Sequence, residues 1–317
     1  MKKHLAFLSD VCLTVSSLII LLYATSTISQ AQQNVRGIHV AANGQSCSGS
    51  EAANTKPSNN DPNLAALKGA QQRWALVIGV DNYANHNIEN LGGAWHDASA
   101  MGTTLEKYGG FDTRLLSNAA REEILNTLQE MGKQAKGSRP ELLLVSISGH
   151  GFLYNGESYL LPADARVDGK LRSLLVTSIR TSEIKAYLKS IGAKQILIFL
   201  DVCLVSIDQD LDQTGQMEID FKGLNTADVT TVYAAQVGYP SYENKSKQVG
   251  YFTSALVEGL RGSAANAKGE VSVKGLYTYA SQVVRQQVCK DFNGFQKPFA
   301  KIEGSNLDSV ILSAVKP

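Results

Sequence analysis

Two apolar stretches of the 317-residue chain each end in a residue type that takes part in nucleophilic catalysis. The run Ile196 to Leu200 is followed by Asp201 and then Cys203, and the run Leu142 to Ser148 leads to His150. Continuous apolar runs of this kind are typical of strands buried on both faces of a parallel sheet. Functional groups in such sheets gather beyond the carboxyl ends of the strands. A thiol and an imidazole that meet there have the chemistry of a nucleophile and its base.

Cys203 taken alone has a simpler explanation, because most cysteines are small buried apolar residues. His150 does not fit a core position, since it lies between Gly149 and Gly151. Two glycines allow unusual backbone angles and let a ligand approach the main chain. The histidine therefore makes the catalytic interpretation of the cysteine the stronger one.

Segments with strand and helix patterns alternate along the chain, which predicts an α/β fold with a mostly parallel sheet and helices on both faces. Thr181 or Ser182 is expected to cap the third helix. The expected strands are 74–80, 111–116, 142–148, 195–203, 229–235 and a late edge strand at 310–312; the expected helices are 94–108, 119–135, 181–191, 252–260 and 273–288.

The motifs Ser148-Gly-His-Gly151 and Asp201-Val-Cys203 resemble the two catalytic motifs of the caspase-like cysteine peptidases. They are most similar to those of the metacaspases, paracaspases and bacterial orthocaspases. Three more segments resemble the family in the same order, so that the resemblance covers about residues 73 to 290: Trp74–Val80, Tyr159–Asp164 and Gly250–Leu256. The resemblance implies a caspase-like three-layer sandwich with about six strands, a Cys203–His150 dyad and polypeptide substrates.

The expected mechanism follows from the chemistry of the thiol. A free cysteine has a pKa of about 8.5 and needs a neighbouring imidazole or an electropositive setting to ionise usefully at neutral pH. We expect Cys203 to attack an amide carbonyl, and His150 to take the thiol proton and pass it to the leaving amine. The backbone N–H groups of Gly151 and Cys203 are expected to stabilise the oxyanion, because glycine at 151 leaves the carbonyl uncrowded.

Three carboxylates stand at positions that match the acidic specificity pocket of the paracaspase and metacaspase branch: Asp97, Asp201 and Glu243. The resemblance implies that they bind a guanidinium group, which predicts cleavage after Arg, then Lys, and none after Asp. Asp97 is equally explained as a charge at a helix N-terminus, and Glu243 as an exposed loop residue. Asp201 ends a buried strand and therefore needs a partner.

The residues after the nucleophile depart from the family pattern. Leu204-Val205-Ser206 stands where family members often have small polar residues. Two bulky apolar residues there narrow the site or mark it as degenerate. A catalytically degenerate, caspase-like binding module is therefore the alternative function, and a thiol hydrolase of non-peptide amides is a third.

The chain from 71 to 315 is expected to form one peptidase domain, with a large-subunit-like part (71–203), a connecting loop (204–228) and a small-subunit-like part (229–315). In the resembling family this connecting loop is often cut by the enzyme itself. Lys222 is the one basic residue in the loop, so autocleavage is predicted after it.

The connecting loop also bears on cofactors, because it contains Asp208, Asp210 and Asp212 at alternate positions. This spacing suggests a calcium loop, but Gln213 and Ile219 occupy the positions that need Gly and Glu. A solvated acidic loop is the favoured interpretation, and no cofactor is expected. The chain has no CxxC pair, so a metal site has no support in the sequence.

Residues 1–31 are typical of a secretory signal peptide, with a basic start, an apolar core and small residues at Ser29 and Ala31. An uncleaved membrane anchor is the alternative. Both predict an exported protein, either periplasmic or secreted, with membrane contact only if the segment is uncleaved. Residues 32–70 are rich in Asn, Gly, Ser, Gln and Ala and are expected to form a low-complexity linker.

The net charge and the cysteine count set further limits. A formal net charge of +1 argues against a nucleic-acid partner. Of the four cysteines, Cys12 lies in the predicted signal. If Cys203 is the nucleophile, Cys47 and Cys289 are available to form a disulfide, and two free thiols are the open alternative.

Overall fold

The structure is a computed structural model that describes residues 67, 72–206, 228–236, 241–244, 247–303 and 310–316, with the main chain only at 203–206 and 303. The strands are β1 Arg73–Gly79, β2 Asp112–Ser117, β3 Leu142–Tyr154, β4 Glu157–Leu160, β5 Ile179–Arg180, β6 Gln195–Ser206, β7 Asp228–Tyr233, β8 Glu243–Asn244, β9 Val249–Gly250, β10 Glu270–Ser272, β11 Phe299–Glu303 and β12 Ile311–Ala314. The helices are α4 Ala94–Thr104, α5 Arg121–Ala135, α6 Leu171–Thr177, α7 Thr181–Ile191, α8 Tyr251–Glu258 and α9 Val273–Phe292, with π-helical turns η1 Leu105–Gly109 and η2 Gly259–Ser263.

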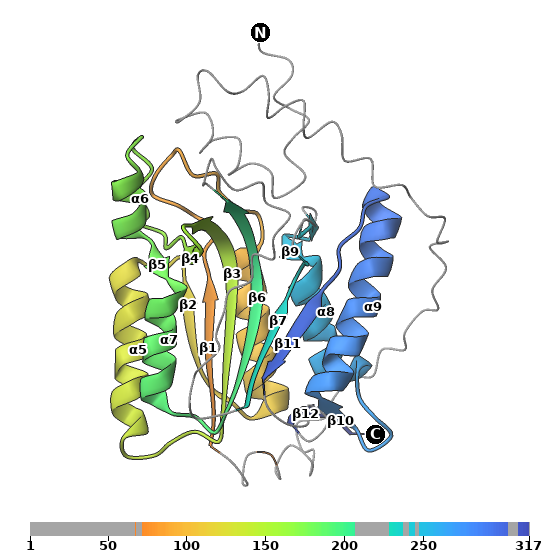
Figure 1. Cartoon of the computed structure of the whole chain (residues 1–317). Helices are drawn as coiled ribbons and strands as arrows, with labels where there is room; N and C mark the ends of the chain where they lie inside the picture. Colours follow the sequence, from red (N-terminus) through yellow and green to blue (C-terminus); the bar gives the residue numbers. More distant parts are fainter. Residues whose placement is uncertain are drawn as a thin grey trace.

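The main sheet has the spatial order β11-β7-β6-β3-β1-β2 (Figure 1). β1 pairs in parallel with β2 and β3, and β6 pairs in parallel with β3 and β7. β11 is antiparallel to β7, while β4 and β5 continue the sheet beside the end of β3. The prediction of a mostly parallel sheet of about six strands is confirmed.

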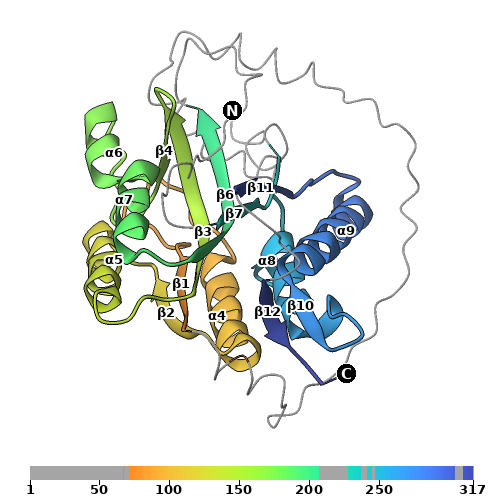
Figure 2. The same cartoon turned by 60° about the horizontal axis from the view of Figure 1, so that its bottom comes forward.

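Helices cover both faces of this sheet, which gives the three-layer sandwich that the resemblance implies (Figure 2). α5 and α7 pack on one face through residues such as Ile124, Leu128 and Leu188. α4, α8 and α9 pack on the other face through residues such as Met101 and Phe252. The sheet therefore separates two hydrophobic cores.

The continuous apolar runs of the sequence are explained by these two cores. Along β3, Leu143 and Val145 belong to the core under α5 and α7, whereas Leu142 and Leu144 belong to the core under α4 and α8. Side chains of a strand alternate between the two faces, so a strand with a core on each side has no solvent-facing position. All seven residues of β1 are buried for the same reason.

A late strand forms where the sequence predicts one, but it does not join the main sheet. β12 begins at Ile311 and pairs with β10 in a separate two-stranded sheet, and β11 instead forms the edge of the main sheet. A strand of four residues carries too little pattern to specify its partner, which is chosen by packing against η1 and η2. Within the described residues, none of the helices has the length and hydropathy that a membrane span requires.

The cap of α7 also differs from the expectation. The helix begins at Thr181 as predicted, but neither Thr181 nor Ser182 caps it with its own side chain. Glu157 of β4 performs this role, because its Oε1 accepts hydrogen bonds from the Ser182 N–H at 3.1 Å and the Thr181 hydroxyl at 3.0 Å. A carboxylate from another element thus satisfies the free N–H groups of this helix end.

The predicted signal peptide (1–31), nearly all of the linker (32–70) and nearly all of the loop 204–228 lie outside the described residues. The domain boundaries and export of the protein stay predictions.

Candidate active site

The long pairing of β3 with β6 brings the predicted dyad together. The register runs from Leu142 opposite Gln195 to Leu153 opposite Ser206, and it places His150 opposite Cys203. Neighbouring strands lie about 4.8 Å apart. The main chains at the predicted nucleophile and base are therefore direct neighbours, and backbone hydrogen bonds of the sheet fix their relative position.

The imidazole of His150 is held through one of its two ring nitrogens. His150 is 2% exposed, and its Nε2 lies 2.9 Å from the carbonyl oxygen of Glu89. A carbonyl only accepts hydrogen bonds, so Nε2 carries the proton. Nδ1 is buried and has no hydrogen-bond partner among the side chains and backbone that the structure describes. The neutral ring thus keeps a free lone pair on Nδ1, which is the atom a base uses.

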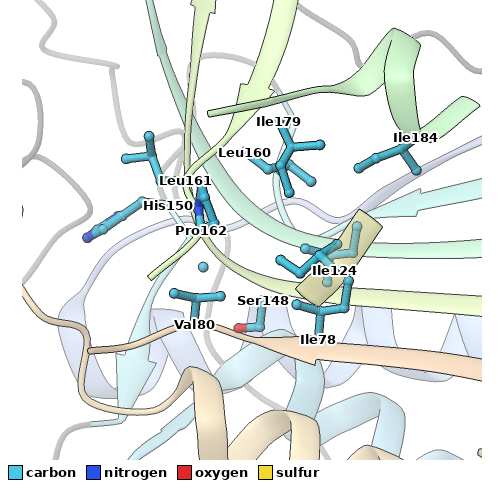
Figure 3. A pocket seen from close by; sticks show the side chains of 12 residues that line it. Ile78, Val80, Ile124, Ser148, His150, Leu160, Leu161, Pro162, Ile179 and Ile184 are labelled. Carbon is cyan, nitrogen blue, oxygen red and sulfur yellow. The ribbon is translucent and has the colours of Figure 1, made fainter. Parts of the chain in front are cut away.

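The backbone of His150 borders a small apolar cavity, but its ring points elsewhere. Residues of β1, β3, α5 and α7 line this cavity, among them Ile78, Ile124 and Ile184. Figure 3 shows the imidazole directed away from these side chains. The cavity is therefore a packing space behind the site, and the ring faces the side on which Glu89 lies.

Tyr83 orients the histidine from a second direction. Its ring is stacked on the imidazole with 5.2 Å between centroids and 26° between planes. Its hydroxyl accepts a hydrogen bond from the His150 N–H at 2.9 Å and donates one to the carbonyl of Val80 at 3.1 Å. The sequence analysis did not identify Tyr83 or the Glu89 carbonyl. Both belong to the loop after β1, whose role depends on a main-chain atom and a stacking contact.

Burial decides the charge of the histidine. Loss of solvent lowers the pKa of His150 to about 4, and the hydrogen bond to Glu89 opposes this shift only in part. The ring is therefore neutral at pH 7, which is the form that accepts a proton from a thiol.

This lowered pKa predicts how the fold responds to acid. An unfolded histidine has a pKa of about 6.5, so the unfolded chain binds the proton more readily. The contribution of His150 to the free energy of unfolding is fully present above pH 6.5 and is lost as the pH falls towards 4. This loss amounts to about 3 kcal/mol. Urea unfolding at pH 7 and pH 4 tests this. The free energy of unfolding is measured for wild type and His150→Leu, and the difference between the two proteins is compared at the two pH values. A difference that does not change with pH would contradict the buried neutral histidine.

Of the three predicted pocket residues, Asp97 and Asp201 have their carboxylates beside Gly250 of β9, whereas the Glu243 carboxylate accepts a hydrogen bond from the Gly92 N–H at 3.4 Å. The Gly250 N–H donates to Asp97 Oδ1 at 3.0 Å and Oδ2 at 3.1 Å, and Glu243 pairs with Gly250 between β8 and β9. A methyl group added to Gly250 would lie 2.8 Å from Asp201 Oδ2 and 2.9 Å from Asp97 Oδ2. Glycine therefore keeps open the space between the two carboxylates.

Burial raises the pKa values of two of these carboxyl groups, those of Asp97 and Asp201. The pKa of Asp97 is well above its usual range because the group is buried and faces the charge of Asp201. Burial also raises the pKa of Asp201, although the hydroxyls of Ser241 at 2.8 Å and Thr253 at 3.0 Å donate to it and oppose the shift. In the described part of the chain, the salt bridges Arg121–Glu183 and Lys194–Glu141 lie elsewhere. The carboxyl groups of Asp97 and Asp201 are thus held by hydroxyl and backbone N–H donors.

The acidic cluster adjoins the dyad through two strands. Ser148, two residues before His150, donates from its hydroxyl to Asp97 Oδ2 at 3.5 Å. Asp201 stands two residues before Cys203 in β6. Two residues along a strand span about 6.6 Å. A side chain bound between the carboxylates would therefore place its own backbone near the dyad.

Other predicted site residues are placed less directly. Gly151 lies in β3 opposite Leu160 of β4 and Leu204 of β6, and its oxyanion role stays a prediction. Lys222 and Cys47 lie outside the described residues, so autocleavage and the Cys47–Cys289 pairing also stay predictions. Cys289 itself is disulfide-bonded.

The described residues offer no centre for a metal ion: they contain no group of three or more His, Cys, Asp or Glu residues that could hold one. Asp208, Asp210 and Asp212 lie outside these residues.

Comparison with known proteins supports the same family as the motifs. Residues 72–303 match the family model for the caspase domain of peptidase family C14. A crystal structure of a Geobacter sulfurreducens protein superposes with a TM-score of 0.53 at 15% identity, covering 77% of this chain and 100% of the other. Caspase-1 from Spodoptera frugiperda gives 0.51 at 18% identity, covering 82% and 96%. A search among curated proteins found no match. With a model match over most of its length and a caspase-like fold, the chain belongs to the caspase-domain family of C14 peptidases.

Proposed function

We propose that the protein is a cysteine endopeptidase that uses a Cys203–His150 dyad and cleaves peptide bonds after basic residues, Arg before Lys. The observation that carries the proposal is the buried Nδ1 of His150, which has no partner within the described residues and belongs to a neutral imidazole in register with Cys203. A buried acceptor without a partner is costly, and a neighbouring thiol is a donor that would satisfy it. Transfer of that proton to Nδ1 would produce the thiolate that attacks the carbonyl.

The preference for basic residues rests on the cluster around Gly250. Two carboxylates that face one another across a gap suit a planar guanidinium, which can bind both at once. Lysine presents a single ammonium group and would bind more weakly in the same space. Aspartate would add a fourth negative charge to Asp97, Asp201 and Glu243 and is excluded by repulsion.

A panel of fluorogenic peptides that differ only in the residue before the scissile bond tests this proposal. Arg substrates are expected to be cleaved with the highest kcat/KM, Lys substrates with a lower one, and Asp substrates not at all. Iodoacetamide is expected to stop the reaction by alkylating Cys203. Efficient cleavage of the Asp substrate would overturn the assigned specificity.

The panel also separates the peptidase from the alternative of a degenerate binding module. Leu204 and Val205, which suggested that alternative, lie in β6 opposite Gly151 and Phe152. A protein that binds Arg peptides but hydrolyses none of them, with or without added calcium, would show that the pocket is kept while the chemistry is lost.

A further inference from the structure

The pocket carboxylate Asp201 is connected to a buried glutamine that lies far from it in the sequence. Gln296, between α9 and β11, has no exposed surface. Its Nε2 donates to the Ser241 hydroxyl oxygen at 3.2 Å, and that hydroxyl donates to Asp201 Oδ1 at 2.8 Å. The three residues form one chain of hydrogen bonds that ends at the pocket carboxylate.

The hydrogen bonds of this chain are donated in one direction, from Gln296 to Ser241 and from Ser241 to Asp201. A carboxylate only accepts hydrogen bonds, so the single hydrogen of Ser241 must go to Asp201. The Ser241 oxygen can then only accept from Gln296. Both hydrogens of the Gln296 amide are used, because Nε2 also donates to the carbonyl of Ala234 at 3.0 Å. The amide therefore holds the serine hydroxyl in the rotamer that aims its hydrogen at the carboxylate.

The same amide fixes the backbone that carries the pocket. Gln296 Oε1 accepts a hydrogen bond from the Tyr242 N–H at 2.9 Å. The ring of Tyr242 is packed at 4.9 Å from Phe292, and Gly294 approaches it so closely that a methyl group there would lie 2.6 Å from its Oη. Tyr242 directly precedes Glu243. One buried side chain thus positions both the donor to Asp201 and the strand of Glu243.

We infer that Gln296 is a positioning residue for specificity: through Ser241 and Tyr242 it holds Asp201 and Glu243 in the arrangement that binds a basic side chain. This inference rests on the proposed function of the pocket. Removal of the amide frees the Ser241 hydroxyl to rotate, and Asp201 then loses a donor that stabilises its charged form. Binding of the basic residue weakens, whereas the dyad on β3 and β6 is unaffected.

The test compares Gln296→Met with wild type and with Gln282→Met, a matched change at an exposed position of α9. Gln296→Met is expected to raise KM for Arg substrates by about 10-fold with little change in kcat, and Gln282→Met to change neither. Binding of benzamidine, an amidinium without a scissile bond, is expected to weaken by a similar factor, and more steeply as the pH is lowered. Alkylation of Cys203 by iodoacetamide is expected to keep its wild-type rate.

A double-mutant cycle separates positioning from general support. If Gln296 acts through Ser241 and Tyr242, it governs the Ser241 contact as well, so the double variant Ser241→Ala/Gln296→Met binds benzamidine about as weakly as Gln296→Met alone. Effects that multiply, or a loss of kcat with KM unchanged, would overturn the inference while the peptidase stands. A wild type that neither hydrolyses Arg peptides nor binds benzamidine would refute the proposed function and the inference together.

Discussion

Replacing His150 with alanine is expected to lower kcat for an Arg peptide substrate by about 10²- to 10⁴-fold. Alanine removes Nδ1, the atom that accepts the thiol proton in the proposed mechanism. The remaining activity should rise with pH towards the ordinary pKa of a thiol, about 8.5, because hydroxide must now ionise Cys203. The measurement is a pH profile of kcat for the two proteins.

The controls for this prediction separate chemistry from folding. His86→Ala changes an exposed histidine of the same loop region and should leave the profile unchanged. Cys203→Ala should remove all activity at every pH, since it deletes the nucleophile. A His150→Ala protein with wild-type kcat at pH 7 would show that another group acts as the base.

Replacing Asp97 with asparagine is expected to stabilise the fold and, in the same protein, to remove most cleavage after arginine. The pKa of Asp97 is raised, so the folded state holds its proton more tightly than the unfolded chain, and ionisation at higher pH costs stability. Asparagine has no charge to bury, and its Oδ1 can still accept from the Gly250 N–H. Tm should rise by about 2–4 °C for each kcal/mol of relief, most clearly above neutral pH.

The effect of Asp97→Asn on activity is opposite to its effect on stability. The negative charge of Asp97 destabilises the folded state but is needed to bind the arginine side chain. Removing one partner of a buried charged pair costs about 2–5 kcal/mol, which corresponds to roughly 30- to 5,000-fold in kcat/KM for Arg substrates. Asp112→Asn, at an exposed position of β2, is the matched control. Calorimetry and kinetics on the same samples measure both effects. An Asp97→Asn protein with a lower Tm and full activity would mean that the carboxylate supports the fold alone.

The positions of the candidate catalytic residues were predictable where these residues follow strands with a clear apolar pattern. His150 and Cys203 follow two mainly apolar runs without a charged residue, and parallel pairing of such runs leaves little freedom in where they end. Asp97 and Glu243 were expected in the pocket only by resemblance, since each also had a simpler explanation. Their convergence on Gly250 depends on β8 and β9, two-residue strands that no periodicity reveals.

The contacts that could not be predicted from the sequence involve atoms or positions that no sequence pattern distinguishes. The partner of His150 Nε2 is a main-chain carbonyl, which every residue has, so nothing distinguishes Glu89 in the sequence. Gln296 resembles any polar residue of a loop until its burial is known. Glu157 caps a helix from another strand, whereas capping rules consider only the residues at the helix end itself.

The unbroken ladder between β3 and β6 has a consequence for how this protein can change. A deletion of one residue within β6 would exchange the two cores, since every side chain beyond the deletion would move to the opposite face. Insertions between the strands, in the segment after β4 for example, leave the register untouched. In a library of length variants, insertions of many residues in the connecting segment should therefore leave His150 and Cys203 paired. A change of a single residue within β6 should separate them.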